Sequence, residues 1–288
     1  AAACSNAGAL GIIGAGGMNA DTLRQNIRRC KELTDKPFGV NVPLMYPEID
    51  TLMRILVEEK VKIVFTSAGN PKTWTKYLKD HDMTVVHVVS SSKFATKCEE
   101  AGVDAIVAEG FEAGGHNGRE ETTTMCLIPA VRKATSLPLL AAGGIGNGQA
   151  MLAALALGAD GVQIGTRFAL TKESSAHENF KKLCLNLKEG DTKVLLKKLS
   201  PTRLVKGDFA TAVEEAEARG ASVEELRELL GKGRAKKGIF EGDLKEGELE
   251  IGQVASLFWE ELSVEEVMKE LIRDFKLSLE NVKTQLCS

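Results

Sequence analysis

No stretch of this 288-residue sequence stays apolar over the roughly 20 residues that a membrane-spanning helix needs. No charged-then-apolar leader is visible either. A basic excess is also missing, because 37 Lys and Arg stand against 40 Asp and Glu, a net charge of −3. Proteins that follow a nucleic-acid backbone normally carry a basic excess or stripe. These absences predict a cytoplasmic protein with neither membrane nor nucleic acid as a partner.

Paired cysteines are absent as well. The six cysteines show no CxxC spacing of the kind that zinc sites and redox pairs use. Most fall inside apparent helices, so we expect reduced and partly buried thiols, and we predict no metal site. The scattered set is Cys4, Cys30, Cys98, Cys126, Cys184 and Cys287. What the sequence does have is 43% hydrophobic residues, enough for a sizeable core.

The first 170 residues repeat one pattern of a short apolar run, a loop of small residues and an amphipathic helical stretch. The runs that predict strands are Leu10–Gly14, Phe38–Leu44, Lys62–Ala68, Thr84–Val89, Asp104–Glu109, Leu137–Ala142 and Gly161–Phe168. The helical stretches are Asp21–Leu33, Ile49–Glu59, Thr73–Asp82, Lys93–Ala101, Thr124–Thr135 and Gly148–Leu157. Continuous apolar strands that alternate with helices are typical of a parallel sheet covered on both faces.

Seven strands are one fewer than a (β/α)8 TIM barrel requires. The chain opens on the helix-like residues Ala1 to Gly8, so we expect the first strand of the barrel to belong before Ala1 and to be missing here. A seven-stranded open sheet is the alternative. The positions of the glycines favour the barrel.

Two glycine-rich loops follow adjacent strands. Ala141-Ala142-Gly143-Gly144-Ile145 opens a helix, and Gly165-Thr166 ends the next strand. Glycines let backbone N–H groups point at a ligand without obstruction by a Cβ atom. The loops after the seventh and eighth strands are the usual phosphate site of such barrels. The pair therefore predicts phosphate binding.

The loop after the fifth visible strand carries a histidine among glycines. It reads Glu109-Gly110-Phe111-Glu112-Ala113-Gly114-Gly115-His116-Asn117-Gly118, and glycine-rich surroundings are a poor site for a purely structural histidine. His116 is therefore the candidate catalytic residue. His81, between charged residues, is predicted to be a solvated surface group, whereas His87 ends a strand and could line the barrel.

Together these residues resemble the FMN-dependent nitronate monooxygenase superfamily, and within it the flavin-type (type II) bacterial enoyl-acyl-carrier-protein reductases. Matching stretches include Gly8–Gly14, Lys36–Val42, Ala68–Pro71, Ala108–His116, Ala141–Ile145, Gln163–Phe168, Thr171–His177 and Ile251–Ala255. No GxGxxG fingerprint follows a strand, which fits FMN better than a dinucleotide fold. In that family a strand ahead of this chain's start would supply a further flavin loop.

The resemblance implies a role for each matched residue. Asn41 would hydrogen-bond the flavin ring, and Glu109 would lie on its polar edge or ribityl side. Backbone N–H groups and the Thr166 hydroxyl would bind the phosphate. The implied cofactor-binding set is Asn41, Glu109, Gly114, Gly143, Gly144, Gln163, Gly165 and Thr166. His116 would be the catalytic or substrate-orienting histidine of a flexible loop.

The C-terminal third changes to helices rich in Lys and Glu. The clearer ones are Asn179–Leu187, Ala212–Ala218, Val223–Leu230 and Val264–Phe275, and a loose basic segment spans residues 231–238. A charge run is usually a solvated face; the functional reading is a lid that meets an acidic carrier protein. We predict an FMN-binding barrel over 1–170, a helical lid or substrate region over 171–262, and a C-terminal helix over 263–288 that returns to the barrel.

The resemblance implies an NAD(P)H-dependent enoyl-acyl-carrier-protein reductase of bacterial fatty acid synthesis. Hydride would pass from reduced FMN to the β-carbon of an enoyl thioester, and His116 would donate a proton or stabilise the enolate electrostatically. Acyl-carrier protein or an acyl thioester would be the substrate, NADH or NADPH the co-substrate, and a homodimer the expected assembly. Two alternatives stay open: a nitronate monooxygenase that uses FMN and oxygen, and a flavin-binding barrel without activity.

Overall fold

The computed structural model describes residues 1–46 and 48–287. The chain divides into two compact units. The first unit holds Ala1–Ala108 and Pro129–Leu140, and the second holds Glu109–Ile128 and the chain from Ala141 onward. The division passes through strand β5 (Ala105–Glu109), helix α6 (Thr124–Ala134) and strand β7 (Leu139–Ala142).

Seven strands form one sheet in the sequential order β1-β2-β3-β4-β5-β7-β8. Besides β5 and β7 they are β1 (Gly11–Gly14), β2 (Phe38–Pro43), β3 (Ile63–Ser67), β4 (Thr84–Val89) and β8 (Gly161–Gln163). Neighbouring strands from β1 to β5 all pair in parallel, for example Val40 against Val64. Sequential parallel strands joined by helices confirm the predicted barrel-type α/β fold.

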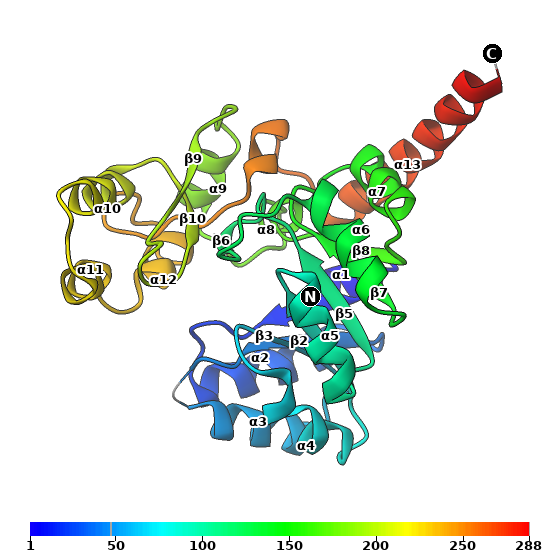
Figure 1. Ribbon diagram of the computed structural model, residues 1–288, viewed down its shortest axis with the longest axis horizontal. Coiled ribbons are helices and arrows are strands. Elements are labelled where there is room, and N and C mark those ends of the chain that lie inside the picture. Colours follow the sequence, from blue (N-terminus) through cyan, green and yellow to red (C-terminus); the bar gives the residue numbers. More distant parts are fainter. Residues whose placement is uncertain (47, 288) are drawn as a thin grey trace. The chain divides into compact units, whose positions relative to one another are not determined.

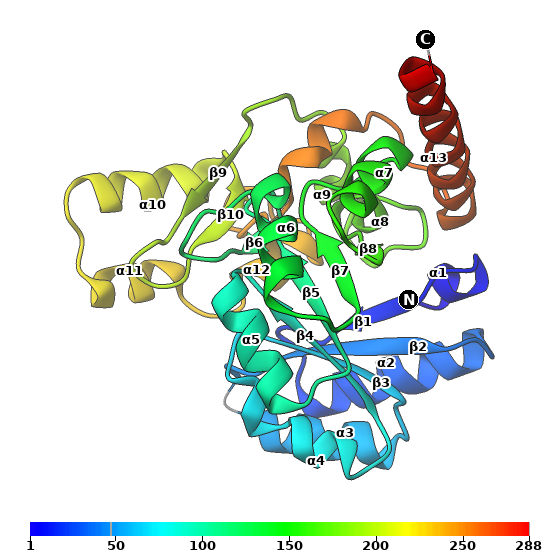
Figure 2. The ribbon, with the colours of Figure 1, turned by 45° about the vertical axis from the view of Figure 1, so that its right-hand side comes forward.

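Helices of the first unit cover its strands. They are α1 (Ala2–Asn6), α2 (Ala20–Leu33), α3 (Ile49–Glu58), the 3-10 turn η1 (Pro71–Thr73), α4 (Thr75–Lys79) and α5 (Ser92–Ala101). Helix α2 begins at Asn19, whose side chain accepts from Thr22 N at 2.8 Å. Its apolar stripe, with Leu23 and Ile27 fully buried, faces the core. Figures 1 and 2 show α2, α3 and α4 together on one side of β2 and β3.

An ion cluster joins α2 to the end of α3 in this unit. The carboxylate of Glu59 is only 9% exposed and lies 2.9 Å from Arg24 and 2.8 Å from Arg28. Lys31 lies at 3.9 Å. Hydrogen bonds from Arg28 and Arg24 hold the pKa of Glu59 below its usual value, because they favour the charged carboxylate.

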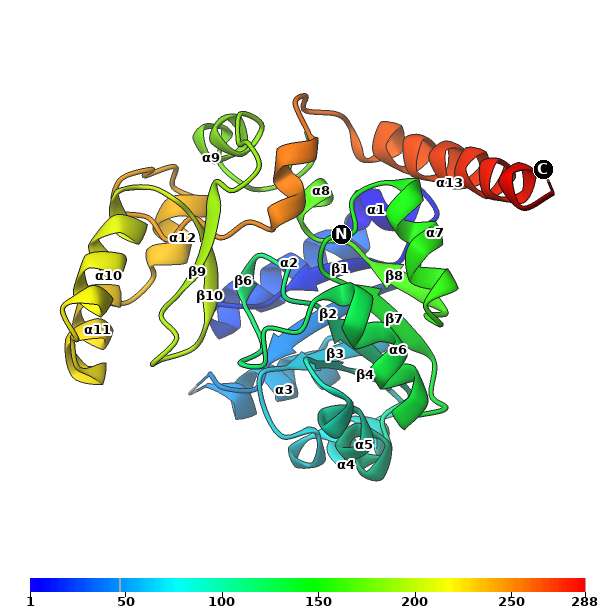
Figure 3. The same ribbon diagram turned by 45° about the horizontal axis from the view of Figure 1, so that its top comes forward.

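The second unit pairs helix α7 (Gly148–Ala156) with the long helix α13 (Val264–Cys287), which lie side by side in Figure 3. A Cβ atom on Gly148 would overlap the backbone at Phe275, so this glycine is what allows the two helices to meet so closely. A helix is present over the expected Val264–Phe275 and continues for twelve further residues, and its role as the closing helix of the barrel stays a prediction.

Three antiparallel strands form a second sheet in this unit, in the order β6-β10-β9. They are β6 (Gly115–His116), β9 (Thr192–Leu195) and β10 (Thr202–Val205). They span two to four residues, and the sequence analysis did not predict them. Figure 3 shows β6 beside β10. The region 171–262, expected as a helical lid, thus contains two strands as well as helices.

The remaining helices of the second unit surround this small sheet. They are α8 (Thr166–Ala169), α9 (Glu178–Cys184), α10 (Asp208–Ala218), α11 (Val223–Leu230), α12 (Arg234–Ile239) and the 3-10 segment η2 (Gln253–Leu257). Two expectations need correction. The strand expected over Gly161–Phe168 ends at Gln163, because α8 begins at Thr166. The expected loose basic segment contains helix α12.

Cysteine positions fit the expectation of free thiols. Cys30, Cys98 and Cys184 are buried and Cys126 is exposed. Burial raises the pKa of both Cys98 and Cys184 to about 12, which leaves them unreactive thiols. Within residues 1–46 and 48–287 no His, Cys, Asp and Glu side chains gather in a group that could hold a metal ion. No described helix has the length and apolar character to cross a bilayer.

Candidate active site

His116 is presented by the small antiparallel sheet of the second unit. It lies on β6 opposite Thr202 of β10, and Gly115 lies opposite Arg203. Its side chain reaches solvent, yet desolvation by the surrounding loop lowers the pKa of the imidazole below its usual value. At neutral pH His116 is therefore mainly the neutral imidazole, able to donate one hydrogen bond and accept another.

The loop around His116 makes hydrogen bonds along its length, and its expected flexibility stays a prediction. Asn117 N donates to Pro201 O at 2.8 Å, and the Asn117 side-chain amide donates to the carbonyls of Ala113 and Gly115, both at 2.9 Å. Further along, Arg119 donates to two carbonyls of the turn between β9 and β10. Gly114 and Gly115 lack a Cβ atom, and this lets residues 250–252 lie close against the backbone of the loop.

Backbone donors for an anion lie where the two glycine loops were expected to provide them. Gly143 and Gly144 have φ angles of 91° and 71°, which favour glycine. Among the described residues, the N–H groups of Gly143, Gly144, Gly165 and Thr166 have no acceptor. Nothing lies within 4 Å of the Cβ position of Gly165, so open space adjoins two of these donors. Unpaired donors beside open space fit a phosphate.

Glu112, which sequence reasoning did not select, joins the His116 loop to the Gly143 loop. Its carboxylate accepts from Thr124 N at 2.9 and 3.1 Å, and Thr124 Oγ1 lies 2.8 Å from the Gly143 carbonyl oxygen. A Cβ atom on Gly143 would lie 2.7 Å from Gly110 O, and one on Gly144 would lie 3.2 Å from the Glu112 side chain. These contacts bring the loop ends of β5 and β7 together and explain why glycines occupy both positions.

The segment Glu250–Gln253 closes the site from far along the sequence. Gly252 N donates to Thr166 Oγ1 at 3.1 Å, and Gln253 N donates to Glu112 O at 3.0 Å. A Cβ atom on Gly114 would overlap Ile251 and lie 2.5 Å from Gly252 N. Gly114 is therefore a packing residue against this segment in the structure, and its predicted contact with the cofactor stays a prediction. The segment holds the His116 loop against the Thr166 hydroxyl.

Two carboxyl groups near this loop resist ionisation. Burial raises the pKa of Glu109, at the end of β5, to about 7. Burial and the neighbouring Glu248 raise the pKa of Glu250 to about 8. Glu250 pairs with Leu204 in an isolated bridge, and its carboxyl oxygen would lie 2.7 Å from a Cβ on Gly115. A mainly protonated acid thus lies against the residue next to His116, and no motif around Glu250 indicates this position.

Three predicted residues lie on or just at the main strands. Asn41 lies within β2 in the first unit, where its carbonyl accepts from Ala15 N at 2.9 Å and its side chain has no partner among the described residues. Gln163 ends β8 in the second unit and is partly exposed. Contact of Asn41, Glu109 and Gln163 with a flavin remains a prediction.

The other three histidines lie outside the His116 loop. His87 is buried, and its Nδ1 lies 2.6 Å from Thr66 Oγ1. Burial lowers its pKa to about 4, so it is neutral. His81 is exposed, as expected. His177 caps α9 by accepting from Asn179 N at 3.1 Å, which gives a structural reason for the Thr171–His177 motif.

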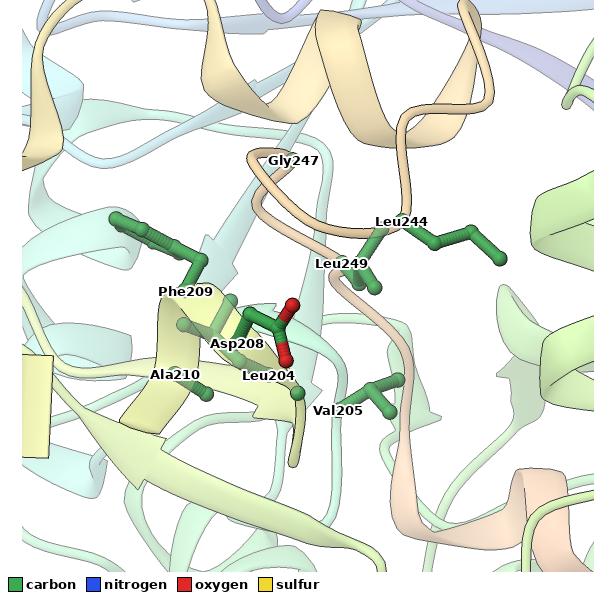
Figure 4. A pocket seen from close by; sticks show the side chains of 9 residues that line it. Leu204, Val205, Asp208, Phe209, Ala210, Leu244, Gly247 and Leu249 are labelled. Carbon is green, nitrogen blue, oxygen red and sulfur yellow. The ribbon is translucent and has the colours of Figure 1, made fainter. Parts of the chain in front are cut away.

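Two hollows lie elsewhere in the second unit. The one in Figure 4, lined by Leu204, Phe209, Leu244 and Leu249 with Asp208 at its edge, leaves no room for a water molecule and is a packing seam. The other has about 220 Å³ of space between the 187–192 turn and η2. Its lining includes Thr192 and Gln253.

Solved structures resemble the chain over nearly its whole length. FabK from Thermotoga maritima is 40% identical with a TM-score of 0.94, over 99% of this chain and 90% of that one. A nitroalkane oxidase from Streptomyces ansochromogenes is 28% identical with a TM-score of 0.83, over 98% of this chain and 92% of that one.

Among sequence relatives, a probable nitronate monooxygenase of Bacillus subtilis is 31% identical over 95% of this chain and 91% of its own length. A Rhodococcus jostii (3aS,4S,5R,7aS)-5-hydroxy-7a-methyl-1-oxo-octahydro-1H-indene-4-carboxyl-CoA dehydrogenase is 35% identical over 75% of this chain, and the match spans 61% of that relative. The nitronate monooxygenase family matches residues 1–52 and 47–274. This chain therefore belongs to the nitronate monooxygenase family and is an FMN-dependent oxidoreductase.

Proposed function

We propose that this protein is an NAD(P)H-dependent flavin enoyl-acyl-carrier-protein reductase of bacterial fatty acid synthesis. The observation that carries the proposal is the 40% identity and TM-score of 0.94 to FabK, together with the His116 loop held beside unpaired backbone donors. The Rhodococcus relative is named for a carboxyl-CoA substrate, which supports a thioester as the substrate class.

The second unit suits FMN at its phosphate end. Gly143, Gly144, Gly165 and Thr166 would donate their free N–H groups to the phosphate. The Thr166 hydroxyl accepts from Gly252, so its own proton is available for a phosphate oxygen. The chemistry that FMN would supply here is hydride transfer to the β-carbon of the enoyl thioester, with NADH or NADPH as the reductant.

His116 would act on the charge that develops at the substrate thioester. Since its imidazole is mainly neutral at pH 7, its N–H can donate a hydrogen bond to the enolate oxygen without a protonation step. If instead it hands a proton to the α-carbon, the active form is the imidazolium, and the rate falls as pH rises above its lowered pKa. The pH profile of the substrate half-reaction therefore separates the two roles.

A second candidate is nitronate monooxygenase, favoured by the Bacillus subtilis relative and by the nitroalkane oxidase structure. The same lowered pKa makes His116 a free base at neutral pH, which suits deprotonation of a nitroalkane. In that reaction oxygen, and not an enoyl thioester, would take the electrons.

Two assays on the same preparation test the proposal. We expect NADH or NADPH to be consumed when a crotonyl thioester is added to the FMN-loaded protein. Oxygen uptake that depends on a nitronate, without thioester-dependent NAD(P)H consumption, would instead establish the monooxygenase. Neither activity in a protein that retains FMN would contradict both.

An acyl-carrier protein as donor of the thioester, and a homodimer as the assembly, belong to the same proposal. The basic segment expected to meet an acidic carrier is largely paired within the chain. Lys236 lies 3.2 Å from Glu241, Lys237 lies 3.2 Å from Asp243, and Arg234 lies 3.1 Å from Glu246. A carrier that docks here would have to compete with these surface pairs, which are individually weak.

A further inference from the structure

We propose that Arg203 of β10 is a positioning residue for His116, holding the catalytic loop in the geometry that the substrate half-reaction needs. The inference rests on the proposed function only for the choice of substrate. The contacts that support it all lie within the second unit.

Arg203 is 2% exposed, and its guanidinium binds the backbone on both sides of Glu112. Nε donates to Ala113 O at 3.1 Å and Nη2 donates to Phe111 O at 2.7 Å. The guanidinium carbon also lies 4.8 Å from the centre of the Phe111 ring. Nη1 donates to Thr192 Oγ1 of β9 at 3.2 Å. The planar fork therefore fixes two carbonyls of the loop against the sheet.

The backbone pairing between β10 and β6 links Arg203 to the position of His116. Arg203 lies opposite Gly115, and its neighbour Thr202 lies opposite His116. Glu112, between the two bound carbonyls, is itself fixed by Thr124 and Gln253. A loop held at Phe111, Ala113 and Gly115 has little room to displace His116.

Burying the charged guanidinium of an arginine costs desolvation free energy, which an apolar side chain of similar size would not. Burial lowers the pKa of the Arg203 guanidinium, and only the charges of Glu112 and Glu121 oppose that effect. Its direct partners are two carbonyls, a hydroxyl and a ring. A buried charge without a direct carboxylate partner is poor evidence for a purely stabilising role. The position of its two carbonyl partners points to the placement of the His116 loop.

The chain offers a matched control in Arg234. Its Nε donates to the carbonyls of Leu229 and Leu230 at 3.1 and 2.8 Å, and its guanidinium carbon lies 4.6 Å from the Phe209 ring. Arg234 is thus an arginine of the same unit that binds a backbone and an aromatic ring, and in the described part of the chain its hydrogen bonds and ring contact do not involve residues 110–118. Arg234 also forms the surface pair with Glu246, so its variants measure the loss of such a grip together with that pair.

The experiment compares R203K, R203M, R234K and R234M in the FMN-loaded full chain. Stopped-flow absorbance gives the rate of flavin reduction by NAD(P)H and, separately, of reoxidation by crotonyl thioester. Because a misplacement of about 1 Å can cost roughly 10²-fold in rate, we expect R203M to slow reoxidation by about 10- to 100-fold and R203K by less. Flavin reduction in both, and both steps in the Arg234 variants, should stay within about twofold of wild type.

Amide hydrogen exchange supplies a readout that does not depend on the reaction. We expect exchange of residues 113–118 to accelerate at least tenfold in R203K, with residues 148–156 of α7 unchanged. Unchanged exchange in residues 113–118, or equal slowing of both half-reactions in R203K and R203M, would overturn the positioning role. Wild-type protein that fails to be reoxidised by the thioester, with fast exchange in R203K, would overturn the proposed function and leave the positioning role standing.

Discussion

Gly165→Ala tests whether the phosphate lies against Gly165. Gly165 precedes α8 with φ −99°, a value that alanine can adopt, and its Cβ position meets nothing within 4 Å. Alanine is a poorer N-cap than glycine but restricts the unfolded chain, and because these effects oppose each other the stability of the cofactor-free protein should stay within about 1 kcal/mol of wild type. An FMN phosphate seated on the N–H groups of Gly165 and Thr166 would meet the new methyl group. Loss of one hydrogen bond to a charged group, worth about 1.5–3 kcal/mol, weakens FMN binding by roughly 10- to 100-fold.

Gly207 is the control, since it also precedes a helix of the second unit, α10, with φ −147° and an open Cβ position. Gly207→Ala should change stability by a similarly small amount and leave FMN affinity unchanged. Fluorescence titration of FMN and thermal unfolding of the cofactor-free proteins give the two quantities. If Gly165→Ala binds FMN as tightly as wild type, the phosphate lies elsewhere and the reasoning from free donors is wrong.

Three further outcomes follow. His116→Ala should keep FMN bound and slow reoxidation by crotonyl thioester about 10²–10⁴-fold, with much less effect on flavin reduction; equal losses in both stopped-flow half-reactions would limit His116 to shaping its loop. Glu250→Gln should become more stable than wild type as pH rises from about 4.5 to 8, because ionisation of Glu250 with its raised pKa of about 8 penalises the folded state; a difference in melting temperature that does not change with pH would refute this. Glu59→Gln should lose about 1–3 kcal/mol of stability at pH 7, measured by urea unfolding. Because the pKa of Glu59 is lowered in the folded state, that loss should vanish as pH falls below the lowered value, and a loss that persists in acid would point to packing instead.

Sequence reasoning succeeded where structure is set locally. Each strand from β1 to β5 was predicted to within about one residue at either end, because continuous β-branched runs and their flanking small residues encode a buried parallel strand. The paired glycines at 143 and 144 were selected because they leave backbone N–H groups unobstructed, and their contact with a phosphate stays a prediction. Their positive φ values need glycine whatever the rest of the chain does.

It failed where the site depends on contacts between distant residues. Nothing in the residues around Arg203 indicates that its side chain reaches Phe111 and Ala113, about 90 positions earlier. The sequence likewise does not distinguish Gly252 from an ordinary turn residue, although its backbone contacts Thr166 and Gly114 in the structure. The glycines near His116 suggested mobility. A sequence shows that a glycine lacks a Cβ atom, but it does not show that residues 250–252 occupy the space beside Gly114 and Gly115.

The dependence of the His116 loop on residues 192–205 and 250–253 has a consequence for the order of folding. The parallel strands of the first unit meet partners some 20 to 30 residues away, whereas the His116 loop meets partners about 80 to 140 residues away. Loops of that span close slowly. During refolding, protection of the amides of β2 and β3 should precede protection of Gly115 and Asn117. Catalytic competence would therefore be acquired late and as a single event, after the C-terminal half of the chain has folded onto this loop.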